Sequence, residues 1–222
     1  KILGRAVDLP NFGTSFFDHY SLNGIAAERV DGLMIRNVKI FEVADYAVLI
    51  RRSARVVVEG IDVRNSGGVD TKGFNNASGG VLFEDGTRVF PIRNSRFENV
   101  LGNGIWTHSR ADAPVNRDGL IEGNVLNEIG RDAIQVGQAS NVRVIGNRGS
   151  RIGYPAKLVD AASWAVPVAL DTAGDVDASV YEGNVFEEIN GKCIDLDGFH
   201  HGVVRRNRCT NSKPLNAYPH AH

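Results

Sequence analysis

Short apolar stretches recur along the chain, and each is interrupted by asparagine or glycine before a further apolar residue. Seven stretches follow this pattern: residues 35–40, 58–63, 92–97, 121–126, 144–149, 181–186 and 204–209. Where no insertion intervenes, a second apolar phrase starts eight residues after the first ends, as from Ile40 to Val48 and from Phe97 to Ile105. Val48 follows the equivalent Ile25 by 23 residues, which is the length of one uninterrupted repeat.

A fixed period of this length predicts a repeat architecture in which each unit buries its apolar side by stacking on its neighbours. A leucine-rich repeat would need Leu-x-x-Leu-x-Leu and often a helical segment, and neither is present. Asparagine and glycine suit the turns between short strands. The expected turn residues are Asn37, Asn94, Asn124, Asn147, Asn184 and Asn207.

From about residue 21 to residue 211, this pattern resembles the right-handed parallel β-helix of the pectate-lyase-like (pectin-lyase-like) superfamily. We therefore expect an all-β, single-stranded right-handed parallel β-helix of about seven to eight coils. The expected organisation is one β-helix domain over residues 1–222, with residues 1–20 and 212–222 as flanking or capping segments. The resemblance also implies an extracellular or periplasmic location.

Alternation of side chains along each strand separates core positions from surface positions. The second phrases start at the anchors Ile25, Val48, Val81, Ile105, Ile134, Val168 and Ile194, which we take as inward. The outward residues three positions after each anchor are Glu28, Arg51, Glu84, His108, Gly137, Asp171 and Asp197. This outward stripe is either an ordinary solvated surface or the floor of a binding groove.

Three insertions favour the groove. Residues 64–80 and 150–167 fall in the turn that leads into the stripe, and residues 109–118 fall just after it. Long loops on a rigid scaffold commonly carry binding and catalytic residues. We therefore expect the stripe to be accessible to solvent and walled by these loops.

The outward residues suggest two kinds of chemistry. Asp171 and Asp197 are expected on adjacent coils, with Asp195 on the same face, and such a group suits acid and base catalysis or oxygen ligation of Ca²⁺. His108 is the nearest predicted proton-transfer partner. Trp106 is either covered by a loop or stacks on a sugar ring. Further candidate substrate-binding residues are Gln135, Glu84, Arg51, Arg110 and His200.

Family motifs are matched only in part. The segment from Gly198 to Gly202, together with Asp195-x-Asp197, is similar to a loosened form of the Gly-His-Gly and paired-aspartate elements of polygalacturonases, but their Asn-x-Asp and Arg-x-Lys elements are absent. A pectate-lyase mechanism would imply Ca²⁺ and a basic residue, for which Arg51, Arg110 and Arg131 are available. The Asp-Pro-His signature of alginate-epimerase-like β-helices is absent as well.

Composition excludes some partners. Lys and Arg number 25 against 26 for Asp and Glu, so the positive excess typical of nucleic-acid binding is lacking. No apolar run reaches the roughly 20 residues of a membrane span, and residues 1–10 lack the apolar core of a signal peptide. Cys193 and Cys209 are either paired, free or simply buried. The sequence does not define an oligomeric state.

We thus expect a carbohydrate-active β-helix protein, a glycoside hydrolase or polysaccharide lyase that binds an extended polysaccharide along the stripe. The alternative is a non-catalytic glycan-binding or structural β-helix module, and an epimerase or transferase is a third option. No cofactor is required by the pattern, and Ca²⁺ held by Asp171, Asp195 and Asp197 is the candidate metal.

Overall fold

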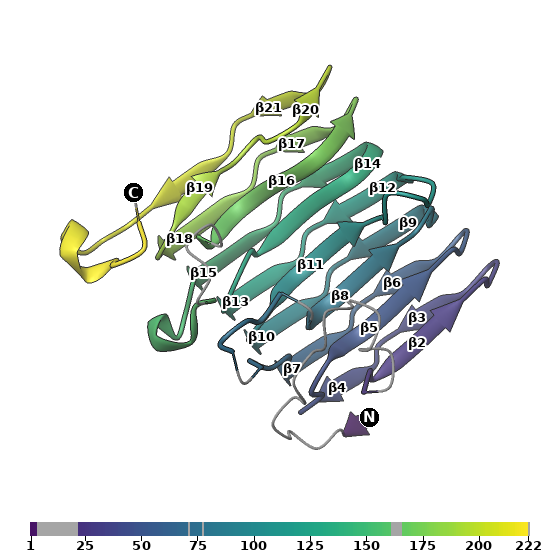
Figure 1. Ribbon diagram of the computed structural model, residues 1–222, viewed down its shortest axis with the longest axis horizontal. Helices are drawn as coiled ribbons and strands as arrows, with labels where there is room; N and C mark the ends of the chain where they lie inside the picture. Colours follow the sequence, from purple (N-terminus) through teal and green to yellow (C-terminus); the bar gives the residue numbers. More distant parts are fainter. Residues whose placement is uncertain (4–21, 71, 77, 161–165, 222) are drawn as a thin grey trace.

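The chain winds into stacked coils of short strands. The computed structural model describes residues 1–3, 22–70, 72–76, 78–160 and 166–221. Figure 1 shows the coils following one another from the N-terminal to the C-terminal end. Every strand pair within these residues is parallel, including β5 (Tyr46–Arg51) with β8 (Gly79–Glu84) and β13 (Val125–Ile129) with β15 (Arg148–Ile152). The predicted parallel β-helix is confirmed.

Each complete coil contributes three strand segments. The first lies in an eight-stranded sheet, here called sheet A. Its strands are β1 (Ile2–Leu3), β4 (Lys39–Phe41), β7 (Asp62–Ser66), β10 (Arg96–Val100), β13 (Val125–Ile129), β15 (Arg148–Ile152), β18 (Val185–Ile189) and β22 (Arg208–Thr210).

A second sheet of 14 strands bends into two arms, because its long strands run through both. The first arm contains β2 (Ile25–Glu28), β5 (Tyr46–Arg51), β8 (Gly79–Glu84), β11 (Asn103–His108), the starts of β14 (Ile134–Ile145) and β16 (Val168–Asp177), and β19 (Lys192–Ile194). The second arm contains β3 (Met34–Arg36), β6 (Val57–Glu59), β9 (Arg88–Arg93), β12 (Asn116–Glu122), the end of β14, β17 (Val180–Glu182) and β21 (Val203–Arg205). The short β20 (Phe199–His200) pairs with the end of β16.

Helical structure among the described residues is limited to two short 3₁₀ turns, η1 (Ala156–Leu158) and η2 (Leu215–Ala217). No described helix has the length and apolar character needed to cross a membrane.

The predicted inward residues form the core. Ile50, Val81, Phe83, Ile105, Ile134, Val136 and Leu170 are all buried. Two predictions for the last coil differ from the structure, since Ile194 is only partly buried and Leu196 is 44% exposed. The reason is that β19 pairs with β16 alone, so no described strand covers its other side.

The anchor predicted for the sixth coil is wrong by two residues. Ile134 pairs with Leu170, and Leu170 pairs with Ile194, so Leu170 and not Val168 is the equivalent of the other anchors. Both residues are apolar and buried, and the preceding insertion removes the fixed spacing that would distinguish them. Asp171 consequently pairs with Gln135 and stands at the level of Asp195, while Ala173 occupies the rung predicted for Asp171.

The six predicted turn asparagines have two separate roles. Asn37 and Asn94 adopt the left-handed conformation, with φ of 53° and 52°. The other four instead form a ladder across coils, in which each Nδ2 donates to the Oδ1 of the next asparagine and to a backbone carbonyl of the preceding coil. The Nδ2–Oδ1 distances are 3.0 Å for Asn124 to Asn147, 2.9 Å for Asn147 to Asn184 and 2.8 Å for Asn184 to Asn207. This ladder satisfies polar groups that the stacked turns bury.

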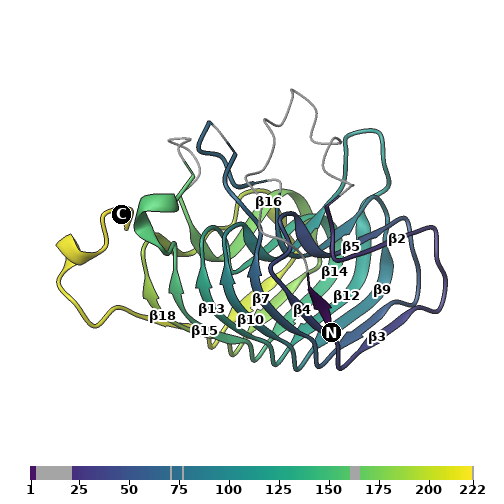
Figure 2. The same ribbon diagram turned by 90° about the horizontal axis from the view of Figure 1, so that it is seen from below.

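The insertions leave the coils on the side of the first arm. Figure 2 shows the segments near residues 70, 112 and 156 projecting from the same side of the coils. In the first insertion, Asp70 Oδ1 accepts hydrogen bonds from the backbone N–H groups of Lys72 and Phe74, as expected for a turn-capping residue. Asp160 of the second insertion accepts hydrogen bonds from Asn75 N at 3.4 Å and from Arg131 Nη1 at 2.7 Å.

The two cysteines form a disulfide that links β19 to β22. Of the alternatives that the sequence left open for these cysteines, the structure therefore shows the paired one. The bond encloses a loop with a sequence separation of 16 residues at the C-terminal coil, where stacking is one-sided. A loop of this length typically contributes about 3 kcal/mol by restricting the unfolded chain.

One buried carboxyl lies in the turn that precedes β5. Asp45 is 1% exposed, and neither of its carboxyl oxygens accepts a hydrogen bond from a described residue. Burial raises the pKa of Asp45 from 3.8 to about 8. The folded protein therefore binds a proton at this site between these pH values, whereas the unfolded chain does not.

Replacement of Ile134 by alanine should lower the free energy of unfolding by about 2–5 kcal/mol, because it leaves a cavity between coils that cannot collapse independently. Urea unfolding followed by circular dichroism measures the effect. The matched control is Leu196→Ala, which removes an exposed side chain and should change stability by less than about 0.5 kcal/mol. Equal effects of the two substitutions would contradict the assigned register.

Replacement of Asp45 by asparagine should reduce the loss of stability that occurs as the pH rises from about 4 to 8. A folded pKa above the unfolded value gives stability that is complete below pH 3.8 and lost toward pH 8, at up to about 1.4 kcal/mol per pH unit. Urea unfolding over this range should show a smaller decline in Asp45→Asn, by as much as about 5 kcal/mol in total. The exposed Asp175→Asn should decline as the parent does, and a parent-like decline in Asp45→Asn would disprove the assignment.

Candidate functional site

A polar cavity of about 210 Å³ opens at the C-terminal end of the first arm. It lies over the starts of β14 and β16 and over β19, on the side from which the insertions project. Its lining residues are Arg131, Asp132, Gln135, Val166, Val168, Asp171, Thr172, Ala173, Lys192, Asp195 and Asp197. The cavity thus brings together five of the residues named from the sequence, namely Arg131, Gln135, Asp171, Asp195 and Asp197.

Asp171 is held by a chain of side-chain amides. Asn103 Nδ2 donates to Gln135 Oε1 at 2.8 Å, and Gln135 Nε2 donates to Asp171 Oδ2 at 2.6 Å. The three residues come from successive coils, and Asp171 is 8% exposed. Because Asn103 Oδ1 also accepts a hydrogen bond from the backbone of Asp132, the orientation of both amides is determined.

The carboxyl groups of the cavity differ in acidity. Burial is the main cause that raises the pKa of Asp171 to about 6, and the negative charge of Asp195 adds to it, although the hydrogen bond from Gln135 opposes the shift. Burial and then the charge of Asp171 raise the pKa of Asp132 to about 8. Near neutral pH, Asp132 therefore holds a proton, while Asp171 titrates just below neutrality.

Two cations accompany these carboxyl groups. Lys192 Nζ lies 2.5 Å from Asp195 Oδ2, and this hydrogen bond is the main cause that raises the pKa of Lys192. Arg131 forms its ion pair with Asp160 of the second insertion and lies 3.7 Å from Asp132. Lys192 thus pairs with Asp195, which stands beside Asp171.

The carboxylates proposed as calcium ligands have polar partners within the protein. Ca²⁺ takes six to eight oxygen ligands. The Lys192 ammonium contacts Asp195, and the Gln135 amide contacts Asp171. Among the described residues, no group of three or more His, Cys, Asp or Glu side chains is arranged to hold a metal ion.

The remaining charged residues of the stripe form a separate ion-pair network toward the N-terminal end. Arg51 and Arg110 contact Asp85 at 2.9 and 2.6 Å, and their hydrogen bonds outweigh the effect of burial and lower the pKa of Asp85. Glu84 lies 3.4 Å from Arg51 and 3.6 Å from His108. The side chain of Glu84 is fully buried, so the prediction that it faces solvent is wrong.

The structure decides between the two alternatives for Trp106 and places His200 outside the cavity. Trp106 is 8% exposed and packs with Tyr46, Leu49 and Leu82, which agrees with the covered alternative and not with an open sugar-stacking platform. His200 lies on β20, at the level of Asp177 near the far end of β16, and does not line the cavity.

Sequence reasoning did not assign Asp132 and Lys192 to the site. Asp132 Oδ1 accepts a hydrogen bond from the Val168 backbone N–H, as a capping residue does, and Asp132 also lines the cavity. Lys192 stands at the level of Val168 in the neighbouring coil. Asp132 and Lys192 each stand two residues before an anchor, Ile134 and Ile194 respectively. Asn103, which also belongs to the hydrogen-bonded chain, stands in the same position before Ile105. This shared position is the sequence signal that could have identified them.

Similar folds occur in proteins of different function. The surface adhesin PfbA of Streptococcus pneumoniae is 16% identical, with a TM-score of 0.67 over 85% of this chain and 50% of the adhesin. The GH136 lacto-N-biosidase from Eubacterium ramulus is 15% identical, with a TM-score of 0.55 over 89% of this chain and 35% of that one. The alginate lyase from Paenibacillus sp. str. FPU-7 is 14% identical, with a TM-score of 0.50 over 90% and 74%.

These structural similarities, at low sequence identity, show a shared fold. The chain spans about half the length of the adhesin. No curated protein sequence is significantly similar to it. The model of the right-handed beta helix region matches residues 17–164, which is more than half of the chain. The strand order, the parallel register and this match agree, and the chain belongs to the right-handed beta-helix family.

Proposed function

We propose that the protein is a carbohydrate-active β-helix enzyme that hydrolyses a glycosidic bond of an extended glycan in the cavity around Asp171. The observation that carries this proposal is the pair formed by Asp171 and Asp195. The two carboxyl groups occupy equivalent positions on adjacent coils, face one cavity and differ in environment. Glycoside hydrolysis requires one carboxyl group as acid and a second as carboxylate.

The environments assign the two roles. Asp171 is buried, with its pKa raised to about 6, so it retains a proton in weakly acidic solution and can donate it to the leaving oxygen. Asp195 is bound by Lys192 and acts as the carboxylate that activates water or attacks the sugar. Gln135 orients Asp171, and Asp197 at the rim accepts hydrogen bonds from sugar hydroxyl groups.

Charge favours hydrolysis of a neutral sugar over elimination from a uronate. A uronate would bring its carboxylate next to Asp171, Asp195 and Asp197, while the two lining cations each pair with a carboxylate of the protein. Like charges in one cavity repel one another, and more strongly where bulk water is excluded. The alginate lyase that shares the fold makes elimination the first alternative to test.

The second candidate function is a non-catalytic glycan-binding or structural module. The observation in its favour is the fold shared with a surface adhesin. An extracellular or periplasmic location belongs to both proposals, because the disulfide between Cys193 and Cys209 is of a kind that persists in oxidising compartments.

A panel of polysaccharides, read out for new reducing ends and for unsaturated products, separates these functions. Hydrolysis yields reducing ends alone, elimination yields both, and a binding module yields neither. Unsaturated product that depends on added Ca²⁺ would replace the hydrolase proposal by a lyase.

On a substrate that the parent cleaves, Asp171→Asn and Asp195→Asn should each lower kcat by about 10²–10⁴-fold, because each removes a group that transfers a proton or binds the reacting sugar. The fold should persist, since neither side chain belongs to the stacked apolar core. Asp175→Asn, which changes an exposed aspartate of the same strand, should retain parental kcat. Parental activity in both cavity variants would overturn the proposal.

The rate should also fall as the pH rises through about 6, because Asp171 then loses the proton that it donates. Steady-state kcat/KM measured from pH 4 to 9 tests this direction. A rate that increases through pH 6 would contradict the role of Asp171 as the acid.

A further inference from the structure

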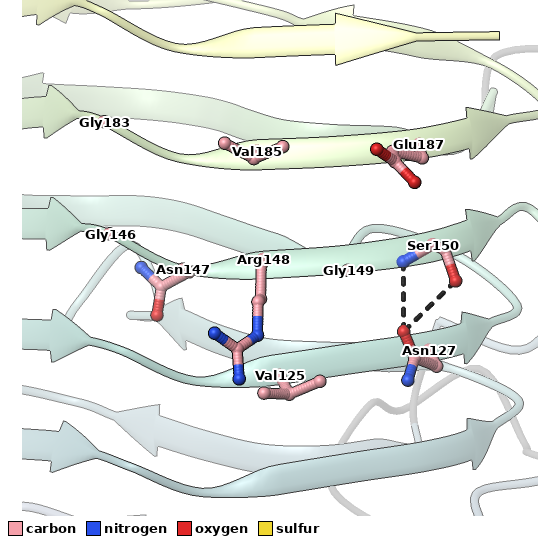
Figure 3. Close-up of a pocket in the computed structure, with 10 residues that line it drawn as sticks. All are labelled: Val125, Asn127, Gly146, Asn147, Arg148, Gly149, Ser150, Gly183, Val185 and Glu187. Atoms are coloured by element: carbon pink, nitrogen blue, oxygen red, sulfur yellow. Dashed lines mark hydrogen bonds between the residues drawn. The ribbon is translucent and has the colours of Figure 1, made fainter.

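A second hollow, of about 570 Å³, lies on the outer face of sheet A. Figure 3 shows it extending across β13, β15 and β18. These strands belong to the same coils as the acidic cavity, but to a different face of the β-helix. None of the residues that line the hollow lines the acidic cavity.

The hollow coincides with a glycine at an inward position of sheet A. Gly149 pairs with Leu126 on one side and with Phe186 on the other. A Cβ at Gly149 would lie 2.1 Å from the backbone oxygen of Leu126 and 3.1 Å from the Phe186 ring. The backbone of β15 thus approaches its neighbours more closely than a side chain would permit, and the outer surface is hollowed at this strand.

Two rows of outward side chains line the hollow. Val125, Arg148 and Val185 are paired residues of the three strands and form the first row. Asn127, Ser150 and Glu187 form the second row in the same way. Asn127 Oδ1 accepts two hydrogen bonds from Ser150, both at 3.2 Å, which directs the Asn127 amide nitrogen away from Ser150 (Figure 3).

Arg148 differs from the other arginines of this face. Arg64 binds Asp62 at 2.9 Å, Arg96 binds Glu98 at 2.5 Å and Arg208 lies 3.9 Å from Glu187. The exposed Arg148 side chain has no hydrogen bond or ion pair with any described residue, and its neighbours on both adjacent strands are valines. A guanidinium group without a protein partner can bind a carboxylate or sulfate through two hydrogen bonds.

We propose that this hollow is an accessory site for an acidic pyranose, a sugar ring that carries a carboxylate or a sulfate group. The anionic group binds Arg148, and the C–H face of the ring packs on Val125 and Val185. Ring hydroxyl groups exchange hydrogen bonds with Asn127, Ser150 and Glu187. The site is independent of the proposed hydrolysis, because it lies on another sheet and its arginine attracts anionic groups, which the acidic cavity repels.

Calorimetric titration of the Asp171→Asn protein with three tetrasaccharides tests the proposal, since this variant does not consume a ligand that the parent would cleave. The probes are a galacturonate tetrasaccharide, a sulfated galactose tetrasaccharide and a neutral galactose tetrasaccharide. At least one acidic probe should bind, about tenfold or more tightly than the neutral one, with an affinity that falls as salt increases. Comparable binding of the neutral probe that is also lost in Arg148→Ala, or binding of no acidic probe, would overturn the proposal.

Variants locate the binding. Arg148→Ala should lower the affinity for the acidic probe by about tenfold or more. Val185→Glu should lower it similarly, because the new carboxylate pairs with Arg148 in place of the ligand. Arg64→Ala, which removes an ion-paired arginine of the same sheet outside the hollow, should bind as the parent does. Parental affinity in Arg148→Ala would reject the site. Cleavage assays run in parallel keep the two proposals separate, because Arg148→Ala should retain parental kcat on a neutral substrate.

Discussion

The structure depends on the fact that a coil of this protein cannot bury its own apolar side chains. Each of its short strands pairs with the strand above and the strand below, and the inward residues become buried only when the neighbouring coils are in place. The same requirement applies to polar groups, since the ladder from Asn124 to Asn207 satisfies backbone carbonyls of the second arm only by spanning from coil to coil. Leu196, on the last coil, is exposed because this condition is met on one side only.

Parallel stacking in register also determines the electrostatics of the surface. Equivalent side chains on adjacent coils lie about 4.8 Å apart, so a repeated acidic residue meets its own kind at close range. The protein meets this condition in two ways. Near the N-terminal end, Arg51 and Arg110 neutralise Asp85. In the cavity, Asp171 and Asp195 are neighbours and Lys192 pairs with Asp195, while burial first and the charge of Asp195 second raise the pKa of Asp171.

The periodic part of the fold could be read from the sequence, whereas its interruptions could not. Inward positions such as Ile105 and Ile134 repeat at a fixed spacing, so their burial follows from the period alone. The insertion before Val168 removes that spacing, and two apolar residues in alternation fit the core equally well. Asp171 was therefore identified as a site residue but placed on the wrong rung. Lys192 and Asp132 were missed because capping and solvation explain such residues equally well in a linear pattern. For Trp106 the sequence left a covered and an exposed alternative open, because the phase of an outward residue does not show what covers it.

Asp160 joins two insertions that lie 85 residues apart, through Asn75 and Arg131. Exchange of the first insertion would remove the Asn75 contact of Asp160, and exchange of the second would remove the carboxylate that pairs with Arg131 at the lining of the acidic cavity. Replacement of both insertions by a matched pair would keep the contact between them, whereas replacement of either one alone would break it. Directed recombination of β-helix loops should therefore transfer these two insertions together and not one at a time.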